Sequence, residues 1–220
     1  MCGRFLLDDN DDIADIRKIF EKLEKFYNDT AEFNNVKKGE IFPTDTVPVI
    51  IPLENFNLDV VPMQWGINIK INNGAGNGYR DNLIINARSE TVYQKKMFRD
   101  SIINKRCVIP ANGFYEWAKV EGKQKKDKYY IKPTESPMFY FAGIYERLPD
   151  PFAFNKEQIR FVIMTREARG HIRSIHDRMP VSVEKKDILK WLNGEIKHIN
   201  EFFTDPKNPE YSFTNLGSAG

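Results

Sequence analysis

Short apolar segments recur along this chain, and they constrain its fold more than any other feature of the sequence. They are rich in β-branched and aromatic residues and are separated by Pro, Gly, Asn and Asp, a pattern typical of β-strands. The segments lie at residues 2–7, 41–53, 58–65, 83–87, 106–110, 113–120, 128–132, 138–145 and 160–165. The sequence therefore predicts a protein built mainly from strands.

Helical periodicity is confined to three stretches. From Asp9 to Tyr27, apolar residues recur at the spacing of one helix face, with acidic residues in the first turn. A second helix is expected from about Ser89 to Lys105, and a third from Val183 to Asn193, closed by Gly194. Residues 72–78 are rich in Asn and Gly and predict a flexible loop.

Together these elements predict the fold class α+β, as a single β-rich domain with a mixed, barrel-like sheet core and flanking helices. No internal repeat and no long linker divides residues 1–220. At 41% hydrophobic and 29% charged residues, the composition is that of a globular protein with enough apolar side chain for a core. We expect residues 204–220 to form a polar, frayed tail.

Charge and hydropathy narrow the classes of function. No apolar run is long enough to span a membrane, and the first residues do not resemble a signal peptide, so we expect a cytoplasmic protein. The net charge of +2 does not indicate a nucleic-acid binder by itself. Any binding to nucleic acid must come from locally placed arginines, because the general phosphate attraction requires a clustered basic face.

The two cysteines, Cys2 and Cys107, are expected to be free thiols. With only three histidines beside them, no spacing typical of metal ligands is present, and we expect no metal or other cofactor.

Cys2 has a chemistry that no internal cysteine shares. Aminopeptidases remove Met1 when the next side chain is small, which would leave Cys2 as an N-terminal 1,2-aminothiol. Its amine can attack an aldehyde, and the thiol can then close a five-membered thiazolidine ring on the imine. The alternative is that a small residue merely follows the initiator, and position alone favours that alternative.

Three other segments contain candidate catalytic or DNA-binding residues. Glu116 stands among aromatic residues in RCVIPANGFYEW, where burial would raise its pKa. Taken alone, a strand glutamate is more often solvent-facing. His176 in HDRMPV could donate or accept a proton, because histidine ordinarily titrates near neutral pH. An isolated histidine, however, more often has a structural role. In NARSET, Asn86 can orient an amine and Arg88 can grip a phosphate, or both can simply end a strand before a helix.

The segments MCGRF, NARSET, RCVIPANGFYEW and HDRMPV, in this order, resemble the SOS-response-associated peptidase (SRAP) family. The resemblance runs from Cys2 to about Trp191. It implies a sensor of abasic sites in single-stranded DNA, in which Cys2 forms a stable thiazolidine crosslink with the ring-opened sugar. It also implies that Asn86, Glu116 and His176 complete the catalytic site.

The resemblance further implies a DNA-binding face. Arg4, Arg88 and Arg178 correspond to residues lining it, and Trp65 and Trp117 to aromatic residues near exposed bases. We expect a monomer with no obligate protein partner. The lysine-rich hairpin over residues 119–128 is expected to be solvated and remote from this face.

Two departures from the family pattern concern the expected DNA-binding face. Two other functions also remain as alternatives. Residues 67–70 differ from the usual family sequence after Gly66, and Gln64 stands where an arginine is common. Residues 167–170 differ from the usual sequence before His176. The family name also implies an autoprocessing peptidase, although a single Met1 before Cys2 needs only a host aminopeptidase. The alternatives are a glutamine amidotransferase-type hydrolase, which also begins Cys-Gly, and a non-catalytic single-stranded DNA-binding module.

Overall fold

A computed structural model describes residues 2–9, 13–28, 30–72, 79–122, 124–150, 157–204 and 210–218. Its centre is a ring of five strands in which each strand pairs with the next and the last pairs with the first. In ring order these are β11 (Phe139–Pro149), β8 (Arg106–Ala111), β3 (Thr46–Pro52), β4 (Leu58–Trp65) and β12 (Glu157–Glu167). This mixed, closed sheet confirms the barrel-like α+β core predicted from the sequence.

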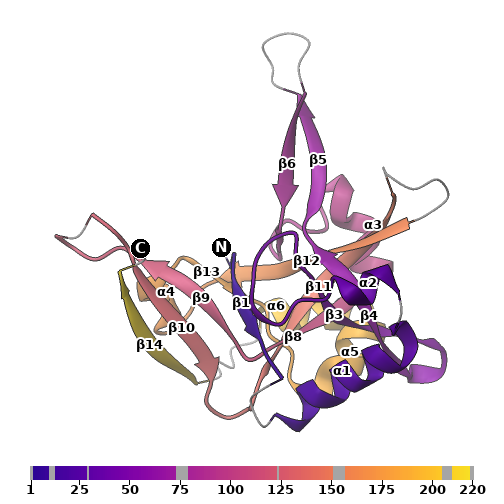
Figure 1. The fold of residues 1–220 in the computed structure, drawn as a ribbon. Coiled ribbons are helices and arrows are strands. Elements are labelled where there is room, and N and C mark those ends of the chain that lie inside the picture. The colour runs from indigo at the N-terminus through magenta and orange to yellow at the C-terminus, as the bar shows by residue number, and fades with distance from the viewer. Residues whose placement is uncertain are drawn as a thin grey trace.

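A second, antiparallel sheet of five strands lies against the barrel (Figure 1). Its order is β14 (Tyr211–Ser218), β10 (Asp127–Pro133), β9 (Gly113–Ala118), β1 (Phe5–Leu7) and β2 (Gly39–Ile41). Buried Asn112 joins the two sheets, because it lies between β8 and β9 and its side chain exchanges hydrogen bonds with the backbone of Asp8. The N-terminal strand is thereby held beside β9.

Strand β12 brings two further segments together at one end of the barrel. It pairs in parallel with β7 (Asn86–Arg88) and antiparallel with β13 (Arg178–Pro180). Thr165 on β12 is opposite Arg88 in one ladder and opposite Pro180 in the other. Residues far apart in the sequence therefore meet here.

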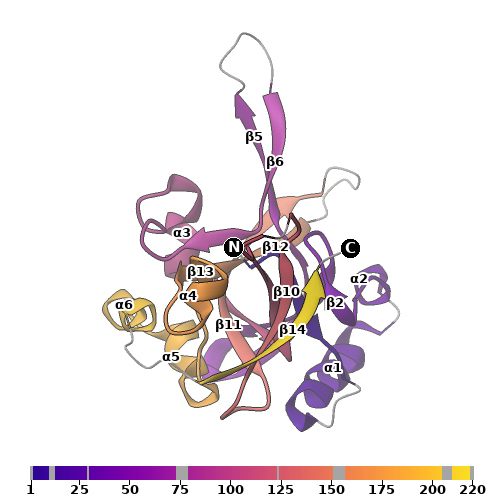
Figure 2. The same cartoon turned by 90° about the vertical axis from the view of Figure 1, so that its left-hand side faces the viewer.

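Strands β5 (Ile67–Asn72) and β6 (Tyr79–Ile84) form a separate two-stranded ribbon that projects from the body in both views (Figures 1 and 2). Of the loop predicted over residues 72–78, residues 73–78 lie outside the described part of the chain.

The helices cover the outside of the sheets. Helix α1 (Ala14–Tyr27) buries the apolar face predicted for it, and α3 (Lys96–Asn104) packs on β11 and β8. The others are α2 (Ala31–Asn34), α4 (Ile172–Ile175), α5 (Ile188–Asn193) and α6 (Ile196–Thr204), with 3-10 turns η1 (Glu54–Phe56) and η2 (Lys185–Asp187). None of the helices in the described residues is long and apolar enough to cross a bilayer.

Buried Arg106 ties the helices to the barrel. Its guanidinium donates hydrogen bonds to five backbone carbonyls, those of Ile102, Ile103, Trp191, Leu192 and Gly194. These carbonyls belong to the ends of α3 and α5, where the last turn of a helix leaves acceptors without an internal partner. One side chain therefore completes both helix ends.

Several predicted elements need correction. The third helix, α5, begins at Ile188 and not at Val183, because residues 185–187 form the 3-10 turn η2. The second helix begins at Lys96, since residues 89–95 form turns. Helix α6 was not predicted. Residues 211–218 are not frayed but form β14, which pairs with β10 from Tyr211 to Ser218. A segment with alternating aromatic and polar residues is stabilised there by the free edge of β10, which the local sequence does not reveal.

Candidate functional site

Cys2 lies three residues before the first residue of β1, and its side chain is fully buried. Its Sγ is 3.9 Å from the backbone oxygen of Arg4, to which it donates a weak hydrogen bond. Asn86, the first residue of β7, donates from Nδ2 to the backbone oxygen of Cys2 at 2.9 Å. The pairing of β7 with β12 therefore places an amide that orients the N-terminal backbone.

Glu116 and His176 face each other beside this cysteine. Oε2 of Glu116 and Nε2 of His176 are 3.9 Å apart, with the two side chains 3% and 23% exposed. Glu116 comes from β9, the neighbour of β1, and His176 directly follows α4. The structure thus brings together all four residues predicted as the catalytic centre.

Burial sets the protonation of the cysteine and the glutamate. It raises the pKa of the Cys2 thiol far above its ordinary value, and the charge of Glu116 raises that pKa further. Burial also raises the pKa of Glu116 to about 7. At neutral pH the thiol is protonated, whereas Glu116 can readily give up or accept a proton.

Burial favours the neutral form of His176. Burial lowers its pKa, while the charge of Asp177 opposes that effect. Nδ1 accepts a hydrogen bond from the backbone N–H of Arg178 at 2.9 Å, which leaves the proton of the neutral ring on Nε2, the nitrogen nearer to Glu116. Nδ1 also lies 2.8 Å from Oδ1 of the exposed Asp177, an ion pair only when the ring is protonated.

Asn86 has one further polar atom of interest. Its Oδ1 is buried and has no hydrogen-bond partner among the described residues. A buried acceptor without a donor costs free energy, and such atoms are often completed by a ligand or a moving group.

Arg4 and Trp117 lie next to the centre in a stack of aromatic rings. Cζ of Arg4 is 4.2 Å from the centroid of the Phe42 ring and 4.9 Å from that of the Trp117 ring. Trp117 follows Glu116 on β9 and therefore projects from the opposite face of the strand. Partly exposed arginine on aromatic rings is suited to contacts with phosphates and bases.

Arg88 and Arg178 differ in exposure. Arg88 is exposed at the end of β7. Arg178 is buried, donates to both carboxylate oxygens of Glu90 at 2.7 and 2.9 Å, and donates to the backbone oxygen of Thr165 at 2.7 Å. The exposed side chain of Arg88 is therefore free of burial that would prevent the predicted phosphate contact. The phosphate contact predicted for Arg178 does not fit the structure, because its guanidinium already binds Glu90 and Thr165 and holds the His176 segment onto β12.

Trp65 also requires correction. Its ring has no exposed surface and packs against Phe5 at 5.2 Å and Phe161 at 6.4 Å between ring centroids. Its Nε1 donates to the backbone oxygen of Ile85 at 2.9 Å. A ring enclosed in this way cannot stack on a DNA base, so Trp65 belongs to the core.

Sequence reasoning missed Glu90 and misplaced the lysine-rich hairpin. Glu90 was expected only at a helix start, and no local signal connects it with Arg178, 88 positions away. Lys119, Lys125 and Lys126 are exposed as predicted. The hairpin is not remote at its base, however, since Nζ of Lys128 lies 2.6 Å from Oε1 of Glu40, the same oxygen that pairs with Arg4.

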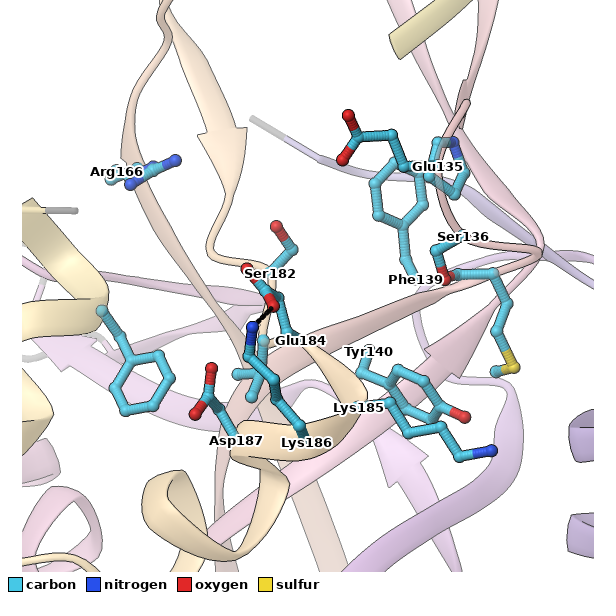
Figure 3. Close-up of a pocket in the computed structure, with 14 residues that line it drawn as sticks. Glu135, Ser136, Phe139, Tyr140, Arg166, Ser182, Glu184, Lys185, Lys186 and Asp187 are labelled. Carbon is cyan, nitrogen blue, oxygen red and sulfur yellow. Dashed lines mark hydrogen bonds and ion pairs between the residues drawn. The ribbon is translucent and has the colours of Figure 1, made fainter. Parts of the chain in front are cut away.

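A cavity of about 570 Å³ lies apart from these residues, between the end of β10 and η2 (Figure 3). Several of its charged groups are paired, Lys186 with Glu184 and Lys185 with Asp15, each at 2.6 Å. None of the four centre residues lines it. In the described residues, no three His, Cys, Asp or Glu side chains converge as metal ligands.

Comparisons with known proteins match this chain over most of its length. The family described as SOS response associated peptidase (SRAP) matches residues 1–216. The abasic site processing protein YoaM of Bacillus subtilis is 34% identical over 197 residues, 88% of this chain and 79% of the relative. The abasic site processing protein YedK of Escherichia coli is 27% identical over 198 residues, 89% of this chain and 81% of the relative.

Solved structures agree on the fold. A protein from Bacteroides thetaiotaomicron superposes with a TM-score of 0.71 at 20% identity, over 98% of this chain and 92% of that protein. One from Bordetella bronchiseptica gives 0.69 at 17% identity, over 98% of this chain and 99% of that protein. With the family match over residues 1–216, these findings show that the chain belongs to the SOS response associated peptidase (SRAP) family.

Proposed function

We propose that this protein processes abasic sites in single-stranded DNA by forming a covalent link through Cys2 after removal of Met1. The names of its relatives support the lesion as substrate. The covalent mechanism is supported by one observation: the side chains of Asn86, Glu116 and His176 lie close to Cys2.

The order of attack follows from the protonation states. Loss of Met1 makes the nitrogen of Cys2 a primary amine, and such amines have pKa values near 7.7–8.0, so a fraction is neutral at physiological pH. The Cys2 thiol has a strongly raised pKa and carries almost no thiolate, which makes it a poor first nucleophile. The amine therefore attacks first and the thiol second. We propose that the buried, unpartnered Oδ1 of Asn86 accepts a hydrogen bond from that amine, because Nδ2 of the same side chain already binds the backbone oxygen of Cys2.

Each proton in the reaction has a carrier. His176 acts as general acid in opening the cyclic sugar to its aldehyde: it protonates the ring oxygen O4′ as the C1′–O4′ bond breaks, and it regains a proton from the C1′ hydroxyl, which becomes the aldehyde oxygen. The amine adds to C1′, and Glu116 protonates the hydroxyl of the carbinolamine, which leaves as water and gives the protonated imine. The thiol then returns a proton to Glu116 as Sγ bonds to C1′. The product is a thiazolidine with new C1′–N and C1′–S bonds, one water is lost, and Glu116 is regenerated.

Ring closure protects the DNA strand. An open imine promotes β-elimination of the 3′ phosphate, which breaks the strand. The thiol belongs to the same residue as the amine, so its attack is effectively unimolecular and outruns that loss. The stable ring shields the lesion.

The test is intact-mass spectrometry of the protein incubated with a single-stranded oligonucleotide carrying one abasic site. The expected adduct is protein lacking Met1 plus DNA, minus one water. Cys2→Ala should abolish it, and Cys2→Ser should leave only an imine that borohydride traps. Cys107→Ala is the matched control, because the second buried thiol should be irrelevant. A wild-type level of stable adduct with Cys2→Ala would refute the proposal.

The family name also describes a peptidase. We propose that a host aminopeptidase removes Met1, because the side chain of the following residue, Cys2, is small. Glu116→Gln produced in bacteria should then still lack Met1. Retention of Met1 in that variant, with its loss in the wild type, would instead indicate autoprocessing.

A further inference from the structure

Strands β1, β2, β9 and β10 carry alternating cations and aromatic rings beside the Cys2 centre. Arg4 lies over Phe42 and Trp117. Nζ of Lys128 lies 4.1 Å from the centroid of the Tyr115 ring and 5.9 Å from that of Trp117. We call these five residues, Phe42, Arg4, Trp117, Lys128 and Tyr115, the cation–aromatic stack.

Sheet register explains the stack. Trp117 is directly opposite Lys128 in the β9–β10 ladder, and Tyr115, two residues earlier on β9, projects from the same face. Arg4 is placed by the hydrogen bond from the backbone N–H of Tyr115 to its backbone oxygen, at 2.9 Å. Glu116 points to the opposite face, so the stack and the catalytic pair lie on the two sides of one strand.

One carboxylate bridges the two cations. Oε1 of Glu40, on β2, is 3.1 Å from Nη1 of Arg4 and 2.6 Å from Nζ of Lys128. The three side chains are 29%, 31% and 19% exposed for Arg4, Glu40 and Lys128 respectively. Water and solutes therefore reach the bridge. An oxyanion held by two cations occupies the position that a phosphate oxygen would take.

We propose that Arg4 and Lys128 together bind one backbone phosphate of the incoming single strand, and that Glu40 is an internal counter-ion which the phosphate displaces. The inference rests on the proposed function only for the identity of the ligand as DNA. Lys128 thereby becomes a DNA-binding residue, and Glu40 a positioning residue that holds both cations on the aromatic rings until DNA arrives.

The rings give the site a second mode of contact. The side chain of Phe42 is 42% exposed, and Trp117 is partly exposed. Bases of any sequence can stack on such rings, and the phosphate between two stacked bases then reaches the cations. Since Glu40 competes with that phosphate, removal of its charge should tighten binding, whereas removal of the Lys128 charge should weaken it.

The experiment measures anisotropy of a dye-labelled, undamaged oligothymidylate over a range of salt concentrations, so that only reversible binding is scored. Lys128→Gln should weaken binding roughly fivefold and reduce the slope of log affinity against log salt by about 0.7, the value for one phosphate contact on a single strand. Glu40→Gln should tighten binding by a similar factor.

Two matched variants separate charge from fold. Lys132→Gln neutralises an exposed lysine on the same strand and should bind as the wild type does. Lys128→Arg keeps the charge and should keep the salt slope. The proposal is overturned if Lys128→Gln behaves like Lys132→Gln, if Lys128→Arg is as weak as Lys128→Gln, or if Glu40→Gln weakens binding.

Crosslinking of wild-type protein to abasic DNA is measured in parallel. If crosslinking fails while the predicted ranking of the variants holds, the proposed function fails and the phosphate site stands. If crosslinking succeeds while the ranking fails, the phosphate site is wrong and the function stands.

Discussion

Replacing Glu116 by Gln should stabilise the folded protein at neutral and alkaline pH, but not at acid pH. The side chain is almost fully buried, and burial raises its pKa from the ordinary 4.5 to about 7. Gln has the shape of the protonated acid and carries no charge. The variant therefore removes the cost of ionising this carboxyl inside the protein and leaves the packing nearly unchanged.

The sign and size follow from linkage between protonation and folding. Below pH 4.5 the carboxyl is protonated in both the folded and the unfolded chain, so its ionisation costs nothing. Between 4.5 and about 7 the unfolded chain loses the proton first, and stability falls as pH rises. Above pH 7 the full cost is present. At about 1.4 kcal/mol per pH unit it amounts to roughly 3 kcal/mol.

The assay is urea denaturation and thermal melting of wild type and variant from pH 4 to pH 8, without DNA and with the same N-terminus confirmed by mass. At pH 8 the variant should melt roughly 6–12 °C higher, and the difference should vanish near pH 4. Glu121→Gln, an exposed glutamate on the same hairpin, should show no such trend. A stability difference that does not change with pH would refute the reasoning.

Three further substitutions distinguish residues that stabilise the fold from residues that bind DNA. Arg178→Ala removes the hydrogen bonds that buried Arg178 makes to the half-exposed Glu90 carboxylate and to Thr165. It should lower the free energy of unfolding by about 2 kcal/mol, as urea denaturation would measure, with an unchanged salt slope for DNA. Arg88→Gln should leave the melting temperature unchanged and reduce the slope of log affinity against log salt by about 0.7. A slope equal to that of the wild type would exclude a phosphate contact at Arg88. Trp65→Phe should cost about 2 kcal/mol of stability through lost volume and the lost Nε1 hydrogen bond, and a selective loss of DNA affinity in a well-folded variant would contradict its place in the core.

The order of elements was largely predictable from local patterns. Strands such as Arg106–Ala111 and Leu58–Trp65 have continuous or alternating apolar residues bounded by turn residues, and helix α1 has one apolar face. Such signals are local, because the backbone periodicity of a strand or helix acts over a few residues. Strand β14 was missed for the converse reason: it is stabilised by pairing with β10, more than 75 positions earlier.

The candidate centre was predictable as a set of residues but not as a geometry. Cys2 stands out by its position after Met1, and Asn86, Glu116 and His176 stand in motifs that resemble those of one family. Their distances, the raised pKa of Glu116 and the proton on Nε2 of His176 depend on burial and on contacts between β7, β9 and α4. Burial is a property of the assembled sheets.

The sequence by itself determined the α+β class and most strands, because each leaves a local pattern, and the family resemblance of its motifs proposed the four residues of the candidate centre. Only the tertiary structure decided which arginines and tryptophans face outward. Trp65 and Trp117 both lie on strands, yet one is enclosed by Phe5 and Phe161 while the other contacts Arg4. Arg178 is occupied by Glu90, and Glu40 links Arg4 to Lys128, through contacts that span 36 to 88 positions. Exposure and charge pairing are set by which distant strands become neighbours, and nothing in the spacing along the chain encodes that choice.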